Sequence, residues 1–154
     1  MTGERFHYDL YIRGAQQKVW DGLRLPEFTR QYWYGVTLDC AWEKGASWRM
    51  LLPDGRVIDS GWILEIEPAK KVVIRWRHEF PDDLAAEGWS RCTLELEPQG
   101  EVVKLTVGHE LENPVENSKF IAAVSGGWPQ LLSSLKSLLE TGAPLPGTSA
   151  PPKV

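Results

Sequence analysis

The sequence predicts an α+β fold in which one antiparallel sheet is covered on a single face by a long C-terminal helix. Three features predict this class. The hydrophobic period changes from helical to two at Val36, alternating segments follow up to Leu111, and a long amphipathic segment occupies residues 116–141. With 154 residues, the chain has the length of one ordinary domain with a single large core.

The start of the chain predicts one strand and two short helices. Residues 6–12 (FHYDLYI) alternate between two faces, which is typical of a half-buried strand. After Gly14, the segment 15–25 places apolar side chains on one helical face, and Pro26 ends that helix. A second short helix is expected at 26–33, because proline is favoured in the first turn of a helix.

The middle of the chain predicts a run of strands, because apolar and polar side chains alternate there. These segments cover residues 36–42, 48–52, 56–67, 70–80, 89–98 and 101–111. The turn sequence PDG at 53–55 predicts a hairpin between the second and the third segment. One-sided alternation indicates an antiparallel sheet with one covered and one solvated face, so the cover must be the C-terminal helix.

Alternation also predicts which side chains point inward. In the segment 56–67 we expect one shared inner face made by Ile58, Ser60, Trp62, Leu64 and Ile66. On the later strands we expect inward side chains at Val72, Ile74, Trp76, His78, Ser90, Cys92, Leu94, Leu96, Val103, Leu105, Val107 and His109.

The C-terminal segment carries a helical pattern that contains a weak point. Its apolar positions follow steps of three and four from residue 120 to residue 139 without a phase slip, straight through the motif GGWP at 126–129. The proline cannot donate to the carbonyl four residues earlier, and each glycine costs about 1 kcal/mol relative to alanine inside a helix. We therefore predict helices at 116–125 and 128–141 with a kink or short break between them.

Composition excludes several classes of function. The net charge is −4 and the pI is about 5.4, so no basic surface for nucleic acid is expected. No apolar run approaches the roughly 18 to 20 residues of a membrane span, and the first residues lack the apolar stretch of a signal peptide; we expect a cytoplasmic protein. Cys40 and Cys92 are expected as reduced thiols. Metal-ligand spacings, phosphate loops and dinucleotide fingerprints do not occur, so we expect no metal and no cofactor.

The last residues differ from the rest in composition. The segment 143–154 (APLPGTSAPPKV) is rich in Pro, Gly and Ser and has little to bury. We predict a single domain at 1–142 followed by a disordered tail.

Three stretches resemble a known family: IRGAQQKVWDGLRLPEFTRQYW (12–33), DSGWILEIEPAKKVVIRW (59–76) and GGWPQLLSSLKSLLETG (126–142). On these residues the chain resembles the START-like (SRPBCC) superfamily, and within it the bacterial proteins similar to the C-terminal domain of the activator of Hsp90 ATPase. The resemblance covers nearly the whole chain up to Gly142. It implies the helix-grip fold, a curved antiparallel sheet wrapped around the long helix, with a cavity between them for an apolar ligand.

The resemblance implies less about function, because this superfamily includes lipid carriers, polyketide cyclases and dehydratases, and co-chaperone domains. An Hsp90-type chaperone is therefore one candidate partner. The 154 residues contain no counterpart of the separate N-terminal domain with which the eukaryotic co-chaperone stimulates its partner, so we do not expect stimulation of a chaperone ATPase.

The candidate ligand site consists of inward residues and one tryptophan of the final helix. We predict that a small hydrophobic ligand contacts Trp48, Met50, Trp62, Trp76, His78, Ser90, Cys92, His109 and Trp128. Tryptophan suits both cavity walls and filled cores, so a core without an open pocket is the alternative. Trp128 at the weak point of the helix could also act as a gate.

Three functions follow from these residues together with what the resemblance implies. The leading hypothesis is a module without enzymatic activity that binds a small hydrophobic ligand or a partner protein. The second is an enzyme similar to cyclases or dehydratases that uses His78 and His109 as acid and base. The third is a chaperone-associated interaction domain. Each histidine could instead form only local hydrogen bonds at the end of its strand, and the protein could be a monomer or a homodimer.

Overall fold

The computed structural model describes residues 5–79 and 82–150. Its elements are β1 (Arg5–Arg13), α1 (Gln16–Arg24), α2 (Pro26–Tyr32), β2 (Thr37–Cys40), β3 (Ser47–Leu51), β4 (Val57–Glu67), β5 (Lys71–His78), α3 (Asp82–Ala85), β6 (Ser90–Gln99), β7 (Val102–Leu111) and α4 (Lys119–Thr141). This order confirms the predicted α+β helix-grip fold, with two short helices after the first strand. The strand predicted at 70–80 ends at His78 in the structure, and residue 80 lies outside the described residues.

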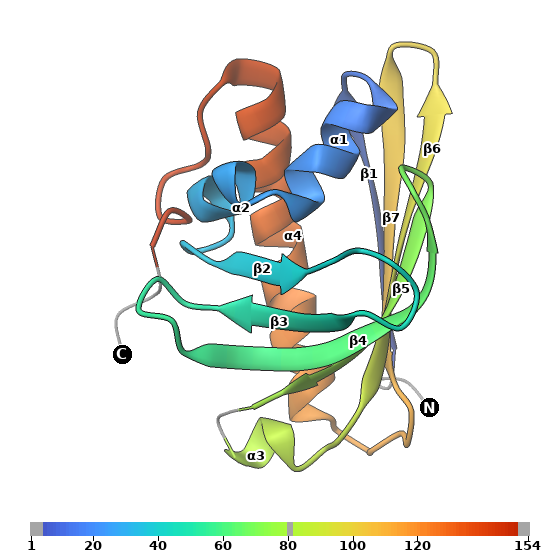
Figure 1. The fold of residues 1–154 in the computed structure, drawn as a ribbon, viewed down its shortest axis with the longest axis vertical. Helices are drawn as coiled ribbons and strands as arrows, with labels where there is room; N and C mark the ends of the chain where they lie inside the picture. The colour runs from blue at the N-terminus through green and yellow to red at the C-terminus, as the bar shows by residue number, and fades with distance from the viewer. Residues whose placement is uncertain (1–4, 80–81, 151–154) are drawn as a thin grey trace.

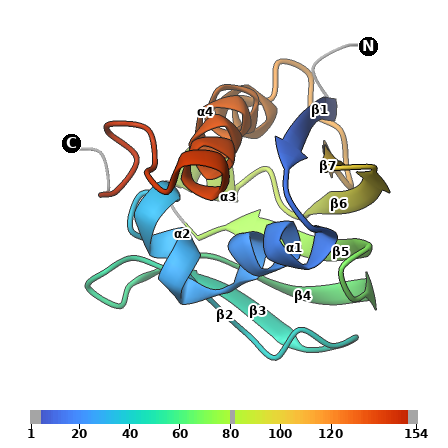
Figure 2. The same ribbon diagram turned by 90° about the horizontal axis from the view of Figure 1, so that it is seen from above.

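The strands form one antiparallel sheet in the order β1-β7-β6-β5-β4-β3-β2. Figure 1 shows α4 running along the sheet, with β2 and β3 crossing in front of it. The view from above shows the sheet curving around α4, α1 and α2 (Figure 2). The curved sheet thus has one covered face, as the alternation of its strands predicts.

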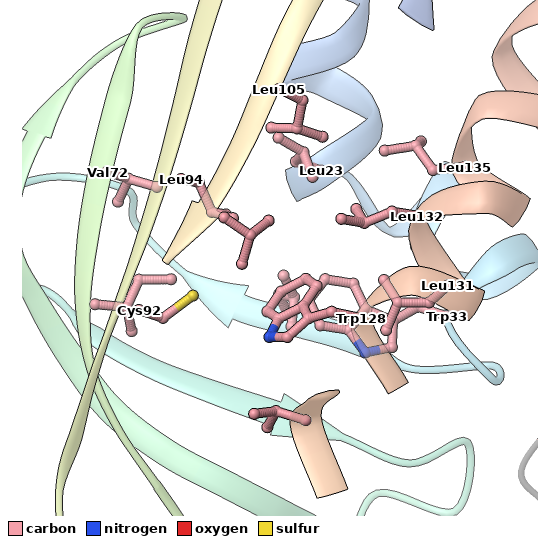
Figure 3. Close-up of a cluster of buried hydrophobic side chains, with 14 of the residues drawn as sticks. Leu23, Trp33, Val72, Cys92, Leu94, Leu105, Trp128, Leu131, Leu132 and Leu135 are labelled. Atoms are coloured by element: carbon pink, nitrogen blue, oxygen red, sulfur yellow. The ribbon is translucent and has the colours of Figure 1, made fainter. Parts of the chain in front are cut away.

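The core lies between the inner face of the sheet and the three helices that it encloses. Figure 3 shows Leu132 and Leu135 of α4 facing the sheet side chains Leu94 and Leu105, with Leu23 of α1 beside them. Apart from Leu94, which is 4 % exposed, each of these side chains is at most 2 % exposed. Burial of such side chains contributes about 1.5–3 kcal/mol each, so this layer holds α4 on the sheet.

Helix α4 is unbroken from Lys119 to Thr141, so the predicted break at 126–129 is wrong. The side chains around the weak point, Val124 before it, Trp128 within it and Leu131 after it, are buried in the same core. This shared burial stabilises a continuous helix more than the local sequence destabilises it. Ser118 caps the first turn, because its hydroxyl accepts the backbone N–H of Ile121 at 3.0 Å.

Strand β4 contains two bulges that reverse the predicted inner face between them. The register shifts once opposite Met50 and Leu51 and again between Ile63 and Glu65. Ile63 is therefore buried, whereas Trp62 is 37 % exposed on the opposite face. The predicted inner face is wrong for Ser60, Trp62 and Leu64, and the residues that replace them are Asp59, Gly61 and Ile63.

The segment after α4, for which we predict disorder, makes specific contacts over its described part, residues 143–150. Thr148 is 1 % exposed, and its hydroxyl lies 2.7 Å from the Ser134 hydroxyl of α4. The backbone N–H of Tyr34 donates to the Thr148 carbonyl at 2.6 Å. These polar contacts fix a segment that has few apolar side chains, which composition alone does not indicate. Residues 151–154 lie outside the described residues, and their disorder stays a prediction.

Candidate functional site

An open pocket of about 420 Å³ lies between α4, the loop after α2 and the strands β3, β4 and β5. Its size falls in the range of small-molecule sites, about 300–1,000 Å³. The residues that line it are Trp33, Tyr34, Met50, Ile58, Asp59, Trp76, His78, Ala123, Val124, Gly127, Trp128 and Leu131. Most of these side chains are apolar, and Asp59 and His78 supply the charged and titratable groups.

The interior next to this pocket is filled by aromatic rings. The ring centroids of Trp48 and Trp76 are 4.4 Å apart, and Trp128 lies 5.9 Å from Trp76 and 5.5 Å from Trp33. A void of about 10 Å³ beside them has room for roughly one water molecule. The structure therefore combines the two alternatives of the sequence, a filled core and a pocket that opens beside it.

The polar end of the pocket is an aspartate–histidine pair. Asp59 and His78 are directly opposite each other on β4 and β5, and Asp59 Oδ2 lies 2.6 Å from His78 Nδ1. The indole N–H of Trp76 donates to the same carboxylate oxygen. Asp59 is 3 % exposed, and burial raises its pKa, although the hydrogen bond and the charge of His78 act in the opposite direction.

His109 lies behind the pocket, in a buried chain of hydrogen bonds that runs from Trp128 to the carbonyl of Trp76. The indole N–H of Trp128 donates to Nδ1 of His109 at 3.1 Å, so Nε2 carries the hydrogen of the neutral ring and faces the Ser90 hydroxyl at 3.0 Å. Ser90 in turn donates to the Trp76 carbonyl at 2.8 Å. Burial and, to a smaller extent, the charge of His78 together lower the pKa of His109 to about 3. His109 is therefore neutral at physiological pH, which does not suit an acid–base role.

The two histidines do not meet. Phe120 of α4 lies between them, with its ring centroid 4.8 Å from that of His78 and 4.9 Å from that of His109. The arrangement separates their roles, because His78 borders the pocket whereas His109 belongs to the core. A shared acid–base pair of His78 and His109 does not fit this geometry.

The other predicted site residues divide between pocket, core and outer face. Met50, Trp76 and Trp128 line the pocket with His78. Trp48, Ser90 and Cys92 are fully buried behind it, and burial raises the pKa of the Cys92 thiol. Ligand contact by these side chains stays a prediction, but only the first group borders the pocket.

Trp62 lies on the outer face of the sheet, away from the pocket. Its ring centroid is 5.1 Å from that of Trp89, and the guanidinium of Arg75 lies 5.0 Å and 4.4 Å from these two rings. Arg75 also forms a two-pronged ion pair with Glu112 at 2.7 and 2.8 Å. Trp62 thus packs in a surface cluster. The alternation predicted for this strand placed it on the inner face instead.

The predicted ligand-binding set lacks eight residues that line the pocket: Trp33, Tyr34, Ile58, Asp59, Ala123, Val124, Gly127 and Leu131. Asp59 was missed because the bulge in β4 changes both its face and its partner.

No helix among the residues described, 5–79 and 82–150, is long and apolar enough to cross a membrane. Within the same residues, no cluster of three or more His, Cys, Asp and Glu side chains could hold a metal ion.

Comparison with known proteins places these observations in context. The family model described as "Activator of Hsp90 ATPase homolog 1-like protein" matches residues 15–140. No curated protein matches the chain. The matched range contains all the residues that line the pocket, including Asp59 and His78.

Solved structures share the fold at low sequence identity. Protein MLL2253 from Mesorhizobium loti has a TM-score of 0.74 and 20 % identity, over 88 % of this chain and 96 % of that one. The Aha1 dimer from Colwellia psychrerythraea has a TM-score of 0.70 and 18 % identity, over 90 % and 97 %. DynU16, from the dynemicin biosynthetic locus, has a TM-score of 0.73 and 21 % identity over 92 % of this chain, which spans about half (49 %) of DynU16.

Proposed function

The chain belongs to the family of activator of Hsp90 ATPase homolog 1-like proteins, and from this premise we propose that it binds a small apolar molecule in the pocket beside α4. The observation that carries the proposal is the pocket of about 420 Å³, whose walls are indoles and aliphatic side chains. The similar fold of DynU16, a protein from a biosynthetic locus, agrees with a small-molecule ligand.

The walls and the polar end define the class of ligand. Trp33, Trp76 and Trp128 offer flat aromatic surfaces, which favour a planar guest. Asp59 and His78 lie at one end, so the ligand has one group that forms hydrogen bonds and an otherwise apolar body. A ligand that is charged along its whole length would lose hydration without compensating partners.

Two neighbouring glycines of α4 give a matched test of this site. Gly127 lines the pocket, whereas Gly126 is exposed beside it, and a Cβ added at either position meets no atom within 4 Å. Leucine at Gly127 would occupy the pocket, and leucine at Gly126 would extend into solvent. Both changes remove a glycine from the interior of a helix, so both are expected to stabilise the fold by up to about 1 kcal/mol.

We expect wild type to bind 1-nitronaphthalene, a planar apolar probe, with saturable quenching of tryptophan fluorescence. Gly127→Leu should weaken this binding by about tenfold or more, which corresponds to about 1.4 kcal/mol, and Gly126→Leu should leave it unchanged. The thermal midpoints of both variants should rise together. Equal binding by the two variants, or quenching of wild type that never saturates, would contradict the proposed site.

The family also suggests a second candidate function, an interaction domain for an Hsp90-type chaperone. This function would use the outside of the domain and would not need the pocket. A complex with such a chaperone that resists physiological salt, and that Gly127→Leu leaves intact, would favour this second function. Because the Colwellia protein is a dimer, the oligomeric state of this chain should be measured in the same samples.

A further inference from the structure

We propose that His78 is a general base in this pocket and that Asp59 holds it in position. The substrate class is a small apolar molecule with an acidic C–H or O–H group. This inference rests on the proposed function, because the pocket must first hold the molecule. It assigns acid–base chemistry to the pair Asp59 and His78.

The contact with Asp59 determines which nitrogen of His78 is available. A carboxylate accepts hydrogen bonds, so at 2.6 Å from Oδ2 the Nδ1 atom of His78 carries the hydrogen. The lone pair of the neutral ring is then on Nε2. His78 borders the pocket with its side chain 16 % exposed, and the proposal requires Nε2 to be the atom that meets a bound ligand.

The pair is also held rigidly. The same carboxylate oxygen of Asp59 also accepts the indole N–H of Trp76, a residue that is 3 % exposed. The ring of Phe120 packs against His78 with the centroids 4.8 Å apart. A base that is fixed in this way loses little freedom when it meets a substrate, which is the condition for efficient proton transfer.

Once His78 takes a proton, its charge is placed beside other charged groups. The imidazolium then lies next to the Asp59 carboxylate in a mostly apolar site. The other titratable groups nearby are Glu79, whose charge raises the pKa of Asp59, Arg77, which lies 3.7 Å from Glu79, and His109 behind Phe120. Because Asp59 and His78 share a hydrogen bond, the pH–rate profile is expected to belong to the pair and not to either residue alone.

The step can be written with a model substrate, 5-nitrobenzisoxazole, which is planar, apolar and small. Nε2 of His78 takes the proton from C3, and the electrons of that C–H bond form the third bond of a nitrile. The N–O bond breaks, its electrons stay on oxygen, and the product is a coloured cyanonitrophenolate. The imidazolium then releases its proton to water, so no oxidant or further reactant is needed.

The test compares wild type with His78→Gln and with the matched control His7→Gln. His7 is an exposed histidine of β1 with its side chain 64 % accessible, so it carries the same group outside the pocket. A positioned base contributes about 10²-fold or more. We expect His78→Gln to lower kcat/KM by about that factor and His7→Gln to leave it unchanged. Addition of imidazole to His78→Gly should restore part of the rate.

The role of Asp59 is tested by Asp59→Asn. The asparagine keeps a partner for the Trp76 N–H but removes the negative charge next to His78. We expect a lower kcat with little change in KM, and a pH–rate midpoint that moves to lower pH, because the imidazolium loses its counter-ion. A lower rate with an unmoved midpoint would overturn the positioning role of Asp59.

Binding of 1-nitronaphthalene, which has no proton of this acidity, separates the two proposals. If wild type binds it but turns over 5-nitrobenzisoxazole no faster than His78→Gln does, the general base is overturned and the ligand site stands. If wild type does not bind it, the ligand site itself fails. If Asp59→Asn does not fold, rescue of His78→Gly by imidazole still decides the role of His78, because absence of rescue contradicts it.

Discussion

Two histidines show how strongly the surroundings of one residue decide its chemistry. His78 has a carboxylate partner and borders the pocket, whereas His109 is 1 % exposed and has only neutral partners. The same imidazole therefore serves as a candidate base in one place and as a structural link in the other. In the second place it joins Trp128 of α4 to Ser90 of β6, which connects the helix to the sheet.

The neutral His109 makes stability depend on pH. Its pKa falls from 6.5 to about 3 on folding, so between these values the unfolded chain binds a proton that the folded chain does not. This group therefore lowers stability by about 1.4 kcal/mol for each pH unit below 6.5, down to the folded pKa, and has no such effect at higher pH.

We expect His109→Gln to be about 1–3 kcal/mol less stable than wild type at pH 7, because its amide fits the hydrogen-bond chain poorly. Between pH 7 and pH 5 the variant should lose less stability than wild type does, since it lacks the titrating ring. Urea unfolding at the two pH values measures both effects. His7→Gln is the control and should lose as much stability between pH 7 and pH 5 as wild type does. If His109→Gln also loses as much as wild type, His109 is not the group that makes stability depend on pH.

At the scale of elements, periodicity predicted the positions of strands and helices but not their irregularities. The residue pairs of β4 and β5 can be counted back from the turn between these strands. If β4 had no bulge between Ile63 and Glu65, this count would place Ser60, and not Asp59, opposite His78. Alternation is a local signal, whereas a bulge depends on the fit between neighbouring strands. The fold was therefore predictable from the sequence, and the partner of the candidate base was not.

Helix α4 shows the opposite error, since a local signal was given too much weight. The motif GGWP predicts a break, yet the phase of the apolar side chains continues through it and the structure follows the phase. The sequence contained both signals. Their balance depends on how much area Val124, Trp128 and Leu131 bury, which only the packed structure provides.

The bulged stretch of β4 requires glycine at one position. Gly61 lies between Trp48 and Trp76 in the sheet, and a Cβ there would lie 1.7 Å from the Arg75 carbonyl oxygen. We expect Gly61→Ala to cost about 3 kcal/mol or more, because backbone must move to admit the methyl group. Gly108→Ala in β7 is the matched control, since a Cβ there meets nothing within 4 Å. Thermal unfolding of both variants makes the comparison, and equal midpoints would contradict the close approach.

At the scale of the whole molecule, the curved sheet encloses both a core and a pocket with the same kinds of side chain. Trp48 and Trp76 are adjacent and both almost fully buried, yet only Trp76 reaches the pocket. Residue type cannot separate these roles, because indoles suit either place. The separation comes from where α4 and the loop after α2 lie on the sheet, which is a property of the complete fold (Figure 2).

The C-terminal segment connects two parts of this fold that border the pocket. Thr148 contacts Ser134 of α4 and accepts the backbone N–H of Tyr34, a residue of the pocket wall. Leu145 adds a third link, because its backbone N–H donates to the Ser134 hydroxyl at 2.9 Å. The segment thus ties the loop after α2 to the helix although it contributes little apolar burial.

Removal of residues 143–154 should therefore leave the fold intact but loosen one wall of the pocket. We expect a loss of about 1–3 kcal/mol in urea unfolding from the hydrogen bonds that the segment makes, faster hydrogen exchange at the Tyr34 amide, and weaker binding of 1-nitronaphthalene. Removal of residues 151–154 alone is the control, because it keeps Thr148 and Leu145, and it should change none of these quantities. If the longer truncation leaves the Tyr34 amide as protected as in wild type, the segment does not hold the wall, and the pocket depends on the sheet and helices alone.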